Sequence, residues 1–111
     1  MSLKVIYHIS HSSFEIEEEK IEEKVELLVE ILKRYGFEEA VELKEEYDDE
    51  RKTVERKFKH KVKPGLLSLL YGKNGLAVYW YEKEEAEEIL KDFASALGRN
   101  LVIKENPQWC F

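Results

Sequence analysis

The stretch EEAVELKEEYDDE (residues 38–50) runs directly into RKTVERKFKHKVK (residues 51–63), so an acidic segment is followed at once by a basic one. In both segments apolar side chains alternate with charged ones, which is typical of β-strands that turn one face toward a core. We therefore predict a β-hairpin whose two strands carry opposite charges. The remaining elements of the fold are predicted outward from this hairpin.

The turn of the hairpin is expected at Glu50 and Arg51, because the apolar positions of both strands then fall on one face. This register gives the following cross-strand partners: Tyr47 with Val54, Leu43 with Phe58, Glu45 with Arg56, and Glu42 with Lys59. Glu45 and Arg56 would then form an inward ion pair, which either guards a sheet edge or lines a cavity; we favour the first. Opposite charges across the hairpin help to fix the register.

Upstream of the hairpin, residues 3–9 are predicted to form a strand, and a long helix is predicted to begin at Ser12. Ser12 and Glu15 match a capping box, in which two side chains satisfy backbone N–H groups at a helix start. Gly36 supplies a left-handed stop at the other end. The apolar stripe between these ends consists of Ile21, Val25, Leu28, Leu32 and Tyr35.

Downstream of the hairpin, residues 64–72 are ambiguous. They fit a short helix that begins at Pro64, and they also fit a strand that enters the turn at Asn74 and Gly75. Their leucine content favours the helix slightly. Residues 76–82 are predicted to form a strand from their β-branched and aromatic content.

A second helix is predicted along the apolar stripe from Ala86 to Leu97, followed by a short strand at residues 101–104. Two β-α-β units separated by an inserted hairpin strand indicate an α+β fold. We predict a two-layer sandwich in which two helices cover one face of a mostly antiparallel sheet, in a ferredoxin-like arrangement. Residues 1–111 are expected to form a single domain.

Composition and charge limit the classes of function. Charged residues make up 38% of the chain and are almost all Glu and Lys, a bias seen in hyperthermophile proteins and in idealised designs. We therefore expect a thermostable protein with a charged surface. The net charge of −6 argues against general binding of nucleic acids. With one cysteine and no apolar run of signal-peptide or membrane-spanning length, a soluble, cytoplasmic protein is expected.

The first candidate site is the junction after the first strand, which contains His8 and His11 together with Ser10, Ser12 and Ser13. A helix that begins there would offer free N–H groups and a positive dipole end to an anion, and histidines can act as acid and base near neutral pH. A plain helix cap with surface histidines is the commoner arrangement. His8 and His11 are the catalytic candidates, and neither is assigned a role. The ligand-binding candidates are His11, Ser12, Ser13, Arg56 and His60.

A metal site would have to draw on His8, His11, His60 and Cys110, since imidazole and thiolate are good zinc ligands. Their spacing matches no metal-binding motif, so neither a metal nor a cofactor is predicted. Cys110 also lacks an identifiable activating partner for a role as a nucleophile.

Residues 51–63 are a candidate RNA-binding surface, because Phe58 lies among several lysines. Strand alternation, however, places Phe58 and the lysines on opposite faces, so one strand cannot easily both stack on a base and contact phosphates. The acidic partner strand can also neutralise the lysines. A solvated face with cross-strand ion pairs is therefore the favoured interpretation.

The sequence contains more large aromatic side chains than one small core needs, including Tyr71, Tyr79, Trp80, Tyr81, Trp109 and Phe111. Aromatic residues on an uncovered sheet face would need a partner, such as a second copy of the chain, the docked C-terminal tail or a ligand. The sequence alone does not define a function. We expect a small binding or interaction module without catalysis of its own, self-associating as a homodimer. The alternatives are an enzyme or anion-binding protein that acts on a small anionic molecule through His8 and His11, and RNA binding through residues 51–63.

Overall fold

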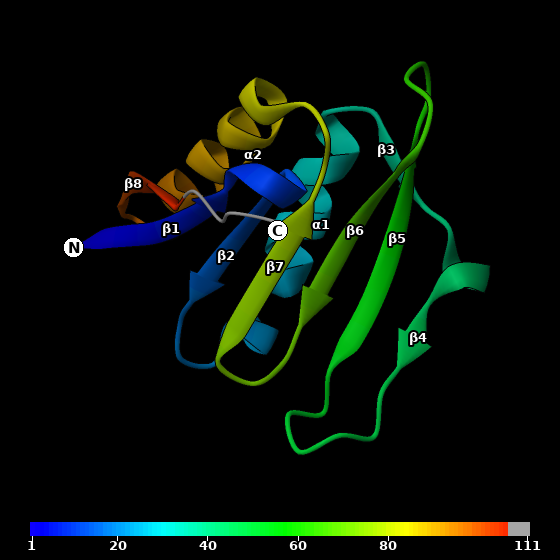
Figure 1. Cartoon of the computed structure of the whole chain (residues 1–111), viewed down its shortest axis with the longest axis horizontal. Helices are drawn as coiled ribbons and strands as arrows, with labels where there is room; N and C mark the ends of the chain where they lie inside the picture. Colours follow the sequence, from blue (N-terminus) through cyan, green and yellow to red (C-terminus); the bar gives the residue numbers. More distant parts are fainter. Residues whose placement is uncertain (107–111) are drawn as a thin grey trace.

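The chain begins with a β-hairpin, continues through a helix and an antiparallel run of strands, and ends with a second helix and a strand (Figure 1). The computed structural model describes residues 1–106. In chain order the elements are β1 (Ser2–His8), η1 (Ile9–His11), β2 (Ser13–Glu17), η2 (Ile21–Glu23), α1 (Val25–Arg34), β3 (Phe37–Glu39), η3 (Val41–Leu43), β4 (Glu45–Glu46), β5 (Val54–His60), β6 (Leu66–Tyr71), β7 (Gly75–Tyr79), α2 (Lys83–Ala96) and β8 (Asn100–Asn106). The predicted α+β class is confirmed.

The strands form one mixed sheet with the order β3-β5-β6-β7-β2-β1-β8, and β4 also pairs with β5. Neighbouring strands are antiparallel except for β1 and β8, which are parallel. A parallel partner for β1 needs a crossover connection, and α2 lies in the connection that leads to β8. The ferredoxin-like arrangement is not confirmed, because β2 lies between β1 and α1 in the chain.

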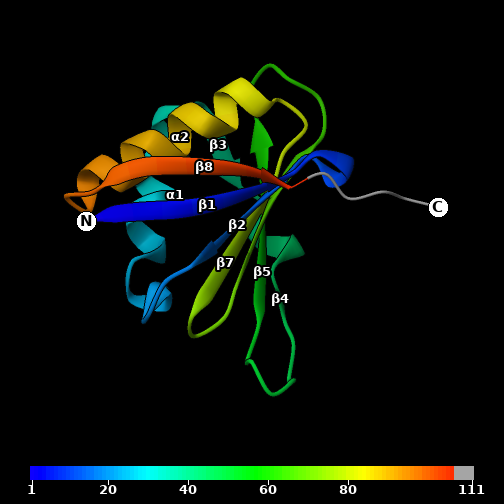
Figure 2. The same ribbon diagram turned by 60° about the vertical axis from the view of Figure 1, so that its left-hand side comes forward.

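Both helices lie on the same side of the sheet (Figure 2). Alternate residues of each strand therefore enter the core: on β1, Leu3 and Val5 are fully buried while Lys4 and Ile6 are exposed. The apolar stripe predicted for the second helix is buried against this core, and Ile89 of α2 is one of its buried residues. The predicted strands at residues 3–9 and 101–104 are confirmed as β1 and β8. The other face of the sheet carries no α-helix among residues 1–106 (Figures 1 and 2).

The predicted helix start at Ser12 is wrong. Residues 13–17 form strand β2, and Ser12 adopts a left-handed conformation with φ of 47° between η1 and that strand. Phe14 and Ile16 alternate at period two and are fully buried, and β2 gains backbone partners from β1 on one side and β7 on the other. Tertiary pairing thus outweighs the local capping signal. The predicted end of the helix is confirmed by Gly36, whose φ is +93°.

The slight preference for a helix at residues 64–72 is also wrong, because Leu66–Tyr71 forms strand β6. Leu67 and Leu69 are fully buried, while Leu66 is exposed and Ser68 is half-buried. This alternation matches a strand, and β6 is paired on both sides, with β5 and with β7. A run of leucines does not separate a buried strand from a short helix by periodicity alone.

The predicted hairpin register is off by one residue at β4 and by four at β3, where Glu39 and not Leu43 lies opposite Phe58, and the acidic strand is interrupted. Glu46 lies opposite Val54, where Tyr47 was expected, and η3 separates β4 from β3, which pairs with the far end of β5. Turn chemistry explains the shift: the Asp49 carboxylate accepts hydrogen bonds from the backbone N–H groups of Arg51 and Thr53. A one-residue shift turns side chains to the opposite face, so Tyr47 is exposed.

Candidate ligand-binding site

Strand register places a row of polar side chains across the uncovered face of the sheet. His8 lies opposite Ser13, Ser13 opposite Tyr79, and Tyr79 opposite Ser68, so these residues stand side by side on β1, β2, β7 and β6. Residues directly opposite each other on one sheet face have Cβ atoms about 5 Å apart. The row therefore concentrates hydroxyl and imidazole groups along one line.

The neighbouring row on the same face is mostly apolar and contains one carboxylate. Glu15 on β2 lies opposite Ile6 on β1 and opposite Ala77 on β7, and Ala77 lies opposite Leu70 on β6. Ala77 presents only a methyl group toward the open side, and Gly75 on β7 presents no side chain. The surface of the sheet is consequently lower at this point than around it.

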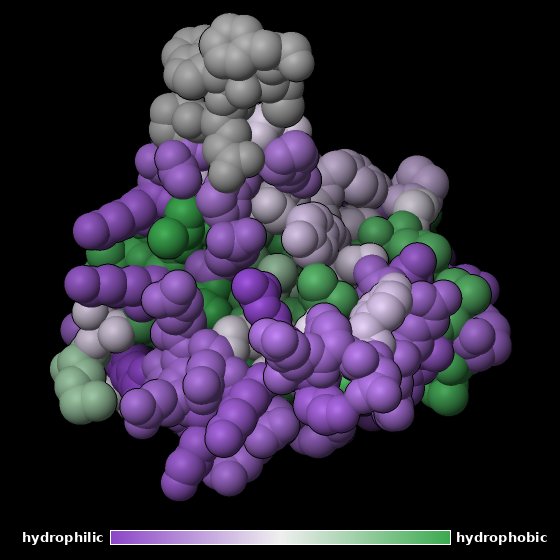
Figure 3. All heavy atoms as spheres, turned by 60° about the horizontal axis from the view of Figure 1, so that its bottom comes forward, coloured by the Kyte–Doolittle hydropathy of each residue, from purple (hydrophilic) through white to green (hydrophobic). Residues whose placement is uncertain are grey.

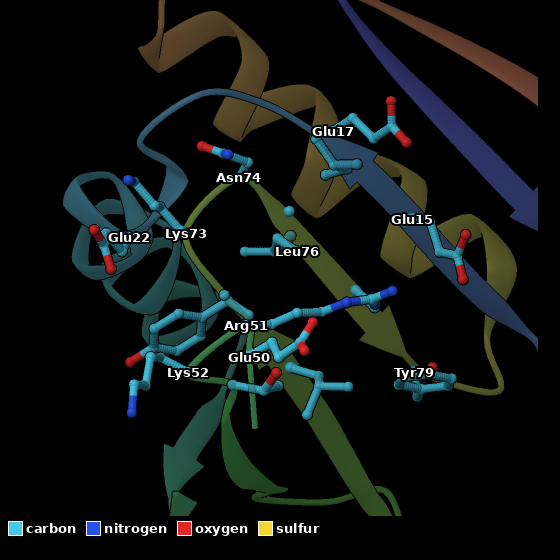
Figure 4. Close-up of a pocket in the computed structure, with 17 residues that line it drawn as sticks. Glu15, Glu17, Glu22, Glu50, Arg51, Lys52, Lys73, Asn74, Leu76 and Tyr79 are labelled. Atoms are coloured by element: carbon cyan, nitrogen blue, oxygen red, sulfur yellow. The ribbon is translucent and has the colours of Figure 1, made fainter. Parts of the chain in front are cut away.

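A hollow of about 830 Å³ lies over this part of the sheet. Gly75, Ala77 and Leu70 contribute to its apolar floor, and the turn around Arg51 and Lys52 forms part of its rim. Figure 4 shows the Arg51 side chain extending from that turn across β7 toward the strand that carries Glu15. In Figure 3, hydrophilic side chains dominate the surface and small apolar patches lie between them. The arrangement combines an apolar floor with a charged rim, as ligand sites do.

A second, smaller pocket of about 390 Å³ adjoins the hollow and is lined by His8, His11, Ser13, Glu15 and Tyr79. The two pockets share Glu15 and Tyr79, so they form one continuous surface on the uncovered face. His8 is only 6% exposed. Its Nε2 lies 2.9 Å from Glu15 Oε2, although the contact is not aligned as a hydrogen bond. Neither ring nitrogen of His8 has a hydrogen-bond partner among the described residues.

The structure brings together three of the site residues that the sequence suggested and leaves three apart. His8, His11 and Ser13 line the small pocket. Ser12 does not line it, and its carbonyl oxygen accepts a hydrogen bond from the backbone N–H of Trp80. The predicted anion site depended on the N-terminus of a helix, and no α-helix begins at Ser12.

Arg56 is buried away from both pockets and is held by two carboxylates. Its Nε and Nη2 donate to the Glu39 carboxylate at 2.8 and 2.6 Å, and its Nη1 donates to Glu26 at 2.6 Å. The Arg56 guanidinium lowers the pKa of Glu39, and the two carboxylates raise the pKa of Arg56. The predicted pairing of Arg56 with Glu45 is wrong, although its inward orientation is confirmed. Such a fully paired guanidinium stabilises the junction of β5 with β3 and α1.

His60 is also part of the framework. Its Nδ1 accepts hydrogen bonds from the backbone N–H groups of Val62 and Lys63, at 3.1 and 3.0 Å. The network therefore assigns the proton to Nε2, which lies 3.1 Å from the carbonyl oxygen of Tyr35. With both ring nitrogens in use, His60 fixes the chain that leaves β5 and lies outside the two pockets.

Glu15 is the site residue that sequence reasoning missed. The local pattern predicts a capping-box role for Glu15, whereas its carboxylate faces the His8 imidazole. The signal was the alternation of Phe14 and Ile16, which implies that Ser13, Glu15 and Glu17 share the opposite face of a strand. Once β2 is a strand paired with β1, the approach of Glu15 to His8 follows from the register.

The lysines of the basic strand mostly have acidic neighbours. Lys59 Nζ lies 3.6 Å from Glu42, although the predicted cross-strand pairing of these two residues is wrong and Glu38 lies opposite Lys59. Lys63 Nζ donates to both Glu82 and Glu85. Phe58 is fully buried and offers no stacking surface. These contacts favour the interpretation of residues 51–63 as a face with paired charges.

The remaining predictions concern a metal site, membrane spans and the aromatic residues. Within residues 1–106, no three His, Cys, Asp or Glu side chains are grouped closely enough to hold a metal ion. None of the helices described is long and apolar enough to cross a membrane. Trp80 is buried and donates from Nε1 to Glu85, whereas Tyr79 and Tyr81 are partly exposed. Trp109, Cys110 and Phe111 lie outside the described residues.

Comparisons of the chain with models of known protein families, with curated proteins and with solved structures gave no match.

Proposed function

We propose that the protein is a small binding module, without catalysis of its own, whose site is the uncovered face of a two-layer sandwich. The single observation that carries the proposal is the hollow with its floor of Gly75, Ala77 and Leu70. An apolar floor favours the flat body of a small organic molecule, and the charged rim supplies groups that orient it. The adjoining pocket at His8 adds a polar end to the same surface.

Filling the floor of the hollow tests this proposal. A panel of small organic compounds is screened by thermal shift, since a ligand that binds the folded state raises the melting temperature. Compounds that do so are then followed by NMR, where the amide signals of Leu70, Ala77 and Tyr79 are expected to move. Ala77→Leu should abolish these effects, because its larger side chain occupies the floor. Ala96→Leu, at an exposed position of α2, is the matched control and should leave them unchanged.

The proposal fails if no compound stabilises the protein, or if compounds that do so bind the Ala77→Leu variant as well as the wild type. The melting temperature of the unliganded variant separates lost binding from lost folding. A variant that unfolds at the wild-type temperature and no longer binds supports the hollow as the site.

Self-association is the second candidate function, and exposed apolar side chains on the same face favour it. Ile6, Leu66, Tyr79 and Val102 are each exposed by more than a third of their area and stand on the uncovered side of their strands. A second copy of the chain placed face to face would bury them. Sedimentation velocity tests this directly: a dimer that Tyr79→Glu dissociates supports it, and a monomer at all concentrations contradicts it.

The alternative of an enzyme acting through His8 and His11 has one observation in its favour, since both imidazoles line one pocket with Ser13. A serine nucleophile needs a base within hydrogen-bond reach, and neither nitrogen of His8 has a hydrogen-bond partner among the described residues. Binding is therefore the better-supported function of this pocket.

A further inference from the structure

His8 is buried at a cost that the described residues do not offset. A buried donor or acceptor that gives up its hydrogen bonds to water and gains no partner destabilises the folded state. Among the described residues, Nδ1 of the His8 ring has no hydrogen-bond partner and Nε2 has only the poorly aligned contact with Glu15 Oε2 at 2.9 Å, although the ring borders a pocket of about 390 Å³. Polar groups in protein interiors are nearly always hydrogen-bonded, so an orphaned imidazole that borders a pocket calls for a polar ligand.

The charge around this pocket selects the class of ligand. Glu15 Oε2 lies 2.9 Å from His8 Nε2, and the two cross-strand neighbours of Glu15 are the apolar residues Ile6 and Ala77. Within residues 1–106, no lysine or arginine lines the small pocket; Arg51, which extends toward the strand of Glu15, lines the adjoining hollow (Figure 4). An anion would approach a carboxylate here, which costs electrostatic energy at short range. A cation at the same place is attracted to the carboxylate.

The shape of the surface adds an apolar requirement. Tyr79 lines both pockets and is partly exposed, so its ring is available to a ligand. A cation within about 6 Å of an aromatic ring is attracted to its face. Beyond Tyr79 the surface continues onto the floor at Ala77, where an apolar body can lie.

We propose that the pocket at His8 binds an organic ammonium ion with an aromatic or apolar body. The ammonium group donates hydrogen bonds to the half-exposed Glu15 carboxylate, beside the His8 ring that borders the pocket. The body lies against Tyr79 and extends over the apolar floor of the hollow. The inference rests on the proposed binding function and names the ligand class of its polar end. It replaces the small anion suggested by the sequence, because the structure adds Glu15 and removes the helix N-terminus.

Three probes of nearly equal size test the charge preference: benzylammonium chloride, benzyl alcohol and sodium benzoate. Each is titrated into the ¹⁵N- and ¹³C-labelled protein at neutral pH while the ring signals of His8 and the amide signals of Glu15 and Tyr79 are followed by NMR. Benzylammonium is expected to give saturable shifts at all three residues and to bind at least about tenfold more tightly than the other two probes.

The charge-removing variant Glu15→Gln keeps the size of the side chain and is expected to weaken benzylammonium binding about tenfold. Glu15 is half-exposed, so this variant is expected to fold, and its melting temperature verifies that. Glu19→Gln is the matched control: it makes the same change in net charge at an exposed position that lines neither pocket. It should alter the affinity by less than about twofold.

Three outcomes overturn the inference: benzoate binds at His8 as tightly as benzylammonium, Glu15→Gln leaves the affinity unchanged, or none of the probes moves the His8 signals. In the last case, compounds from the thermal-shift panel that still move the signals of Leu70 and Ala77 would leave the proposed binding function standing. If neither set of signals moves with any compound, both the inference and the proposed function fail.

Discussion

Replacing Glu39 with Gln removes one of the two carboxylates that hold the buried guanidinium of Arg56. The Glu39 side chain is 15% exposed and that of Arg56 is 9% exposed, so water and salt screen this pair little. Removing one partner of a buried pair costs about 3–5 kcal/mol, because the other charge is left without compensation. Since Glu26 still contacts Arg56, we expect the lower end, about 3 kcal/mol.

Glu26→Gln provides the matched control within the same cluster. The Glu26 carboxylate lies 2.6 Å from Arg56 Nη1, as close as Glu39 lies to Nη2, but its side chain is 75% exposed. Water screens an exposed pair, so this variant is expected to lose less than about 1 kcal/mol. The two variants remove the same charge from the same guanidinium and differ chiefly in burial.

Urea unfolding followed by circular dichroism measures both losses. Thermal unfolding gives a second measure. A loss of 1 kcal/mol lowers the melting temperature of a chain of this size by roughly 4 °C, so Glu39→Gln should lower it by about 12 °C. The reasoning is refuted if both variants lose the same stability, because burial would then not control the energy of the pair.

The pH dependence provides a second readout for the same pair. The Arg56 guanidinium holds the pKa of Glu39 below its ordinary value of 4.5. A carboxylate whose pKa is lowered by folding stabilises the protein above its unfolded-state pKa, and this contribution disappears as the pH falls through the folded-state pKa. The difference in unfolding free energy between wild type and Glu39→Gln should therefore be constant near neutral pH and shrink below pH 4.5. A difference that does not change in acid contradicts the assignment.

Three further predictions concern the strand at 66–71, the end of α1 and a tyrosine hydrogen bond. Leu69→Ala should lower the unfolding free energy by about 3 kcal/mol and Leu66→Ala by less than about 1 kcal/mol, measured by urea unfolding, because their exposed fractions are 0% and 40%. Gly36→Ala should cost about 1–2 kcal/mol in the same assay, since its φ is +93° and a Cβ there would lie 3.2 Å from an imidazole nitrogen. The Asp92 carboxylate accepts a hydrogen bond from Tyr35 Oη at 2.6 Å and raises the pKa of that phenol to about 12; Asp92→Asn should return the pKa toward 10.0, measured by phenolate absorbance.

Each of these predictions has a contrary result. Equal losses for the two leucine variants would mean that residues 66–71 lack the alternation of a strand. A Gly36→Ala variant as stable as the wild type would mean that the helix end tolerates a side chain. Hydrogen bonding to Glu45 also raises the pKa of Tyr47 to about 12, so the wild type should show two late-titrating phenols; two in Asp92→Asn as well would show that another group raises the pKa of Tyr35.

Elements with a clear period and a local stop signal were predictable. The second helix follows from its apolar stripe and from the glutamates of its first turn, and Gly36 ends α1 where the sequence placed the stop. The strands that became β1 and β8 were also recognised, because their alternation is visible within a few residues. In each case the information lies in neighbouring residues.

The errors lie where distant pairing decides the structure. The capping pattern at Ser12 is a correct local signal, but β1 and β7 provide residues 13–17 with backbone partners on both sides. Residues 66–71 likewise gain backbone partners on both sides, from β5 and from β7. The hairpin register moved by one residue because Asp49 organises the turn through its own hydrogen bonds.

The candidate site depends on these distant pairings. The sequence by itself determined the α+β class, the position of His8 at the end of a strand, and the proximity of His11 and Ser13 along the chain. Only the tertiary structure decided that Glu15 faces His8 and that Tyr79 completes their pocket. The physical reason is that a strand side chain acquires its neighbours from the strands paired beside it, and pairing is fixed by hydrogen bonds between segments far apart in the sequence.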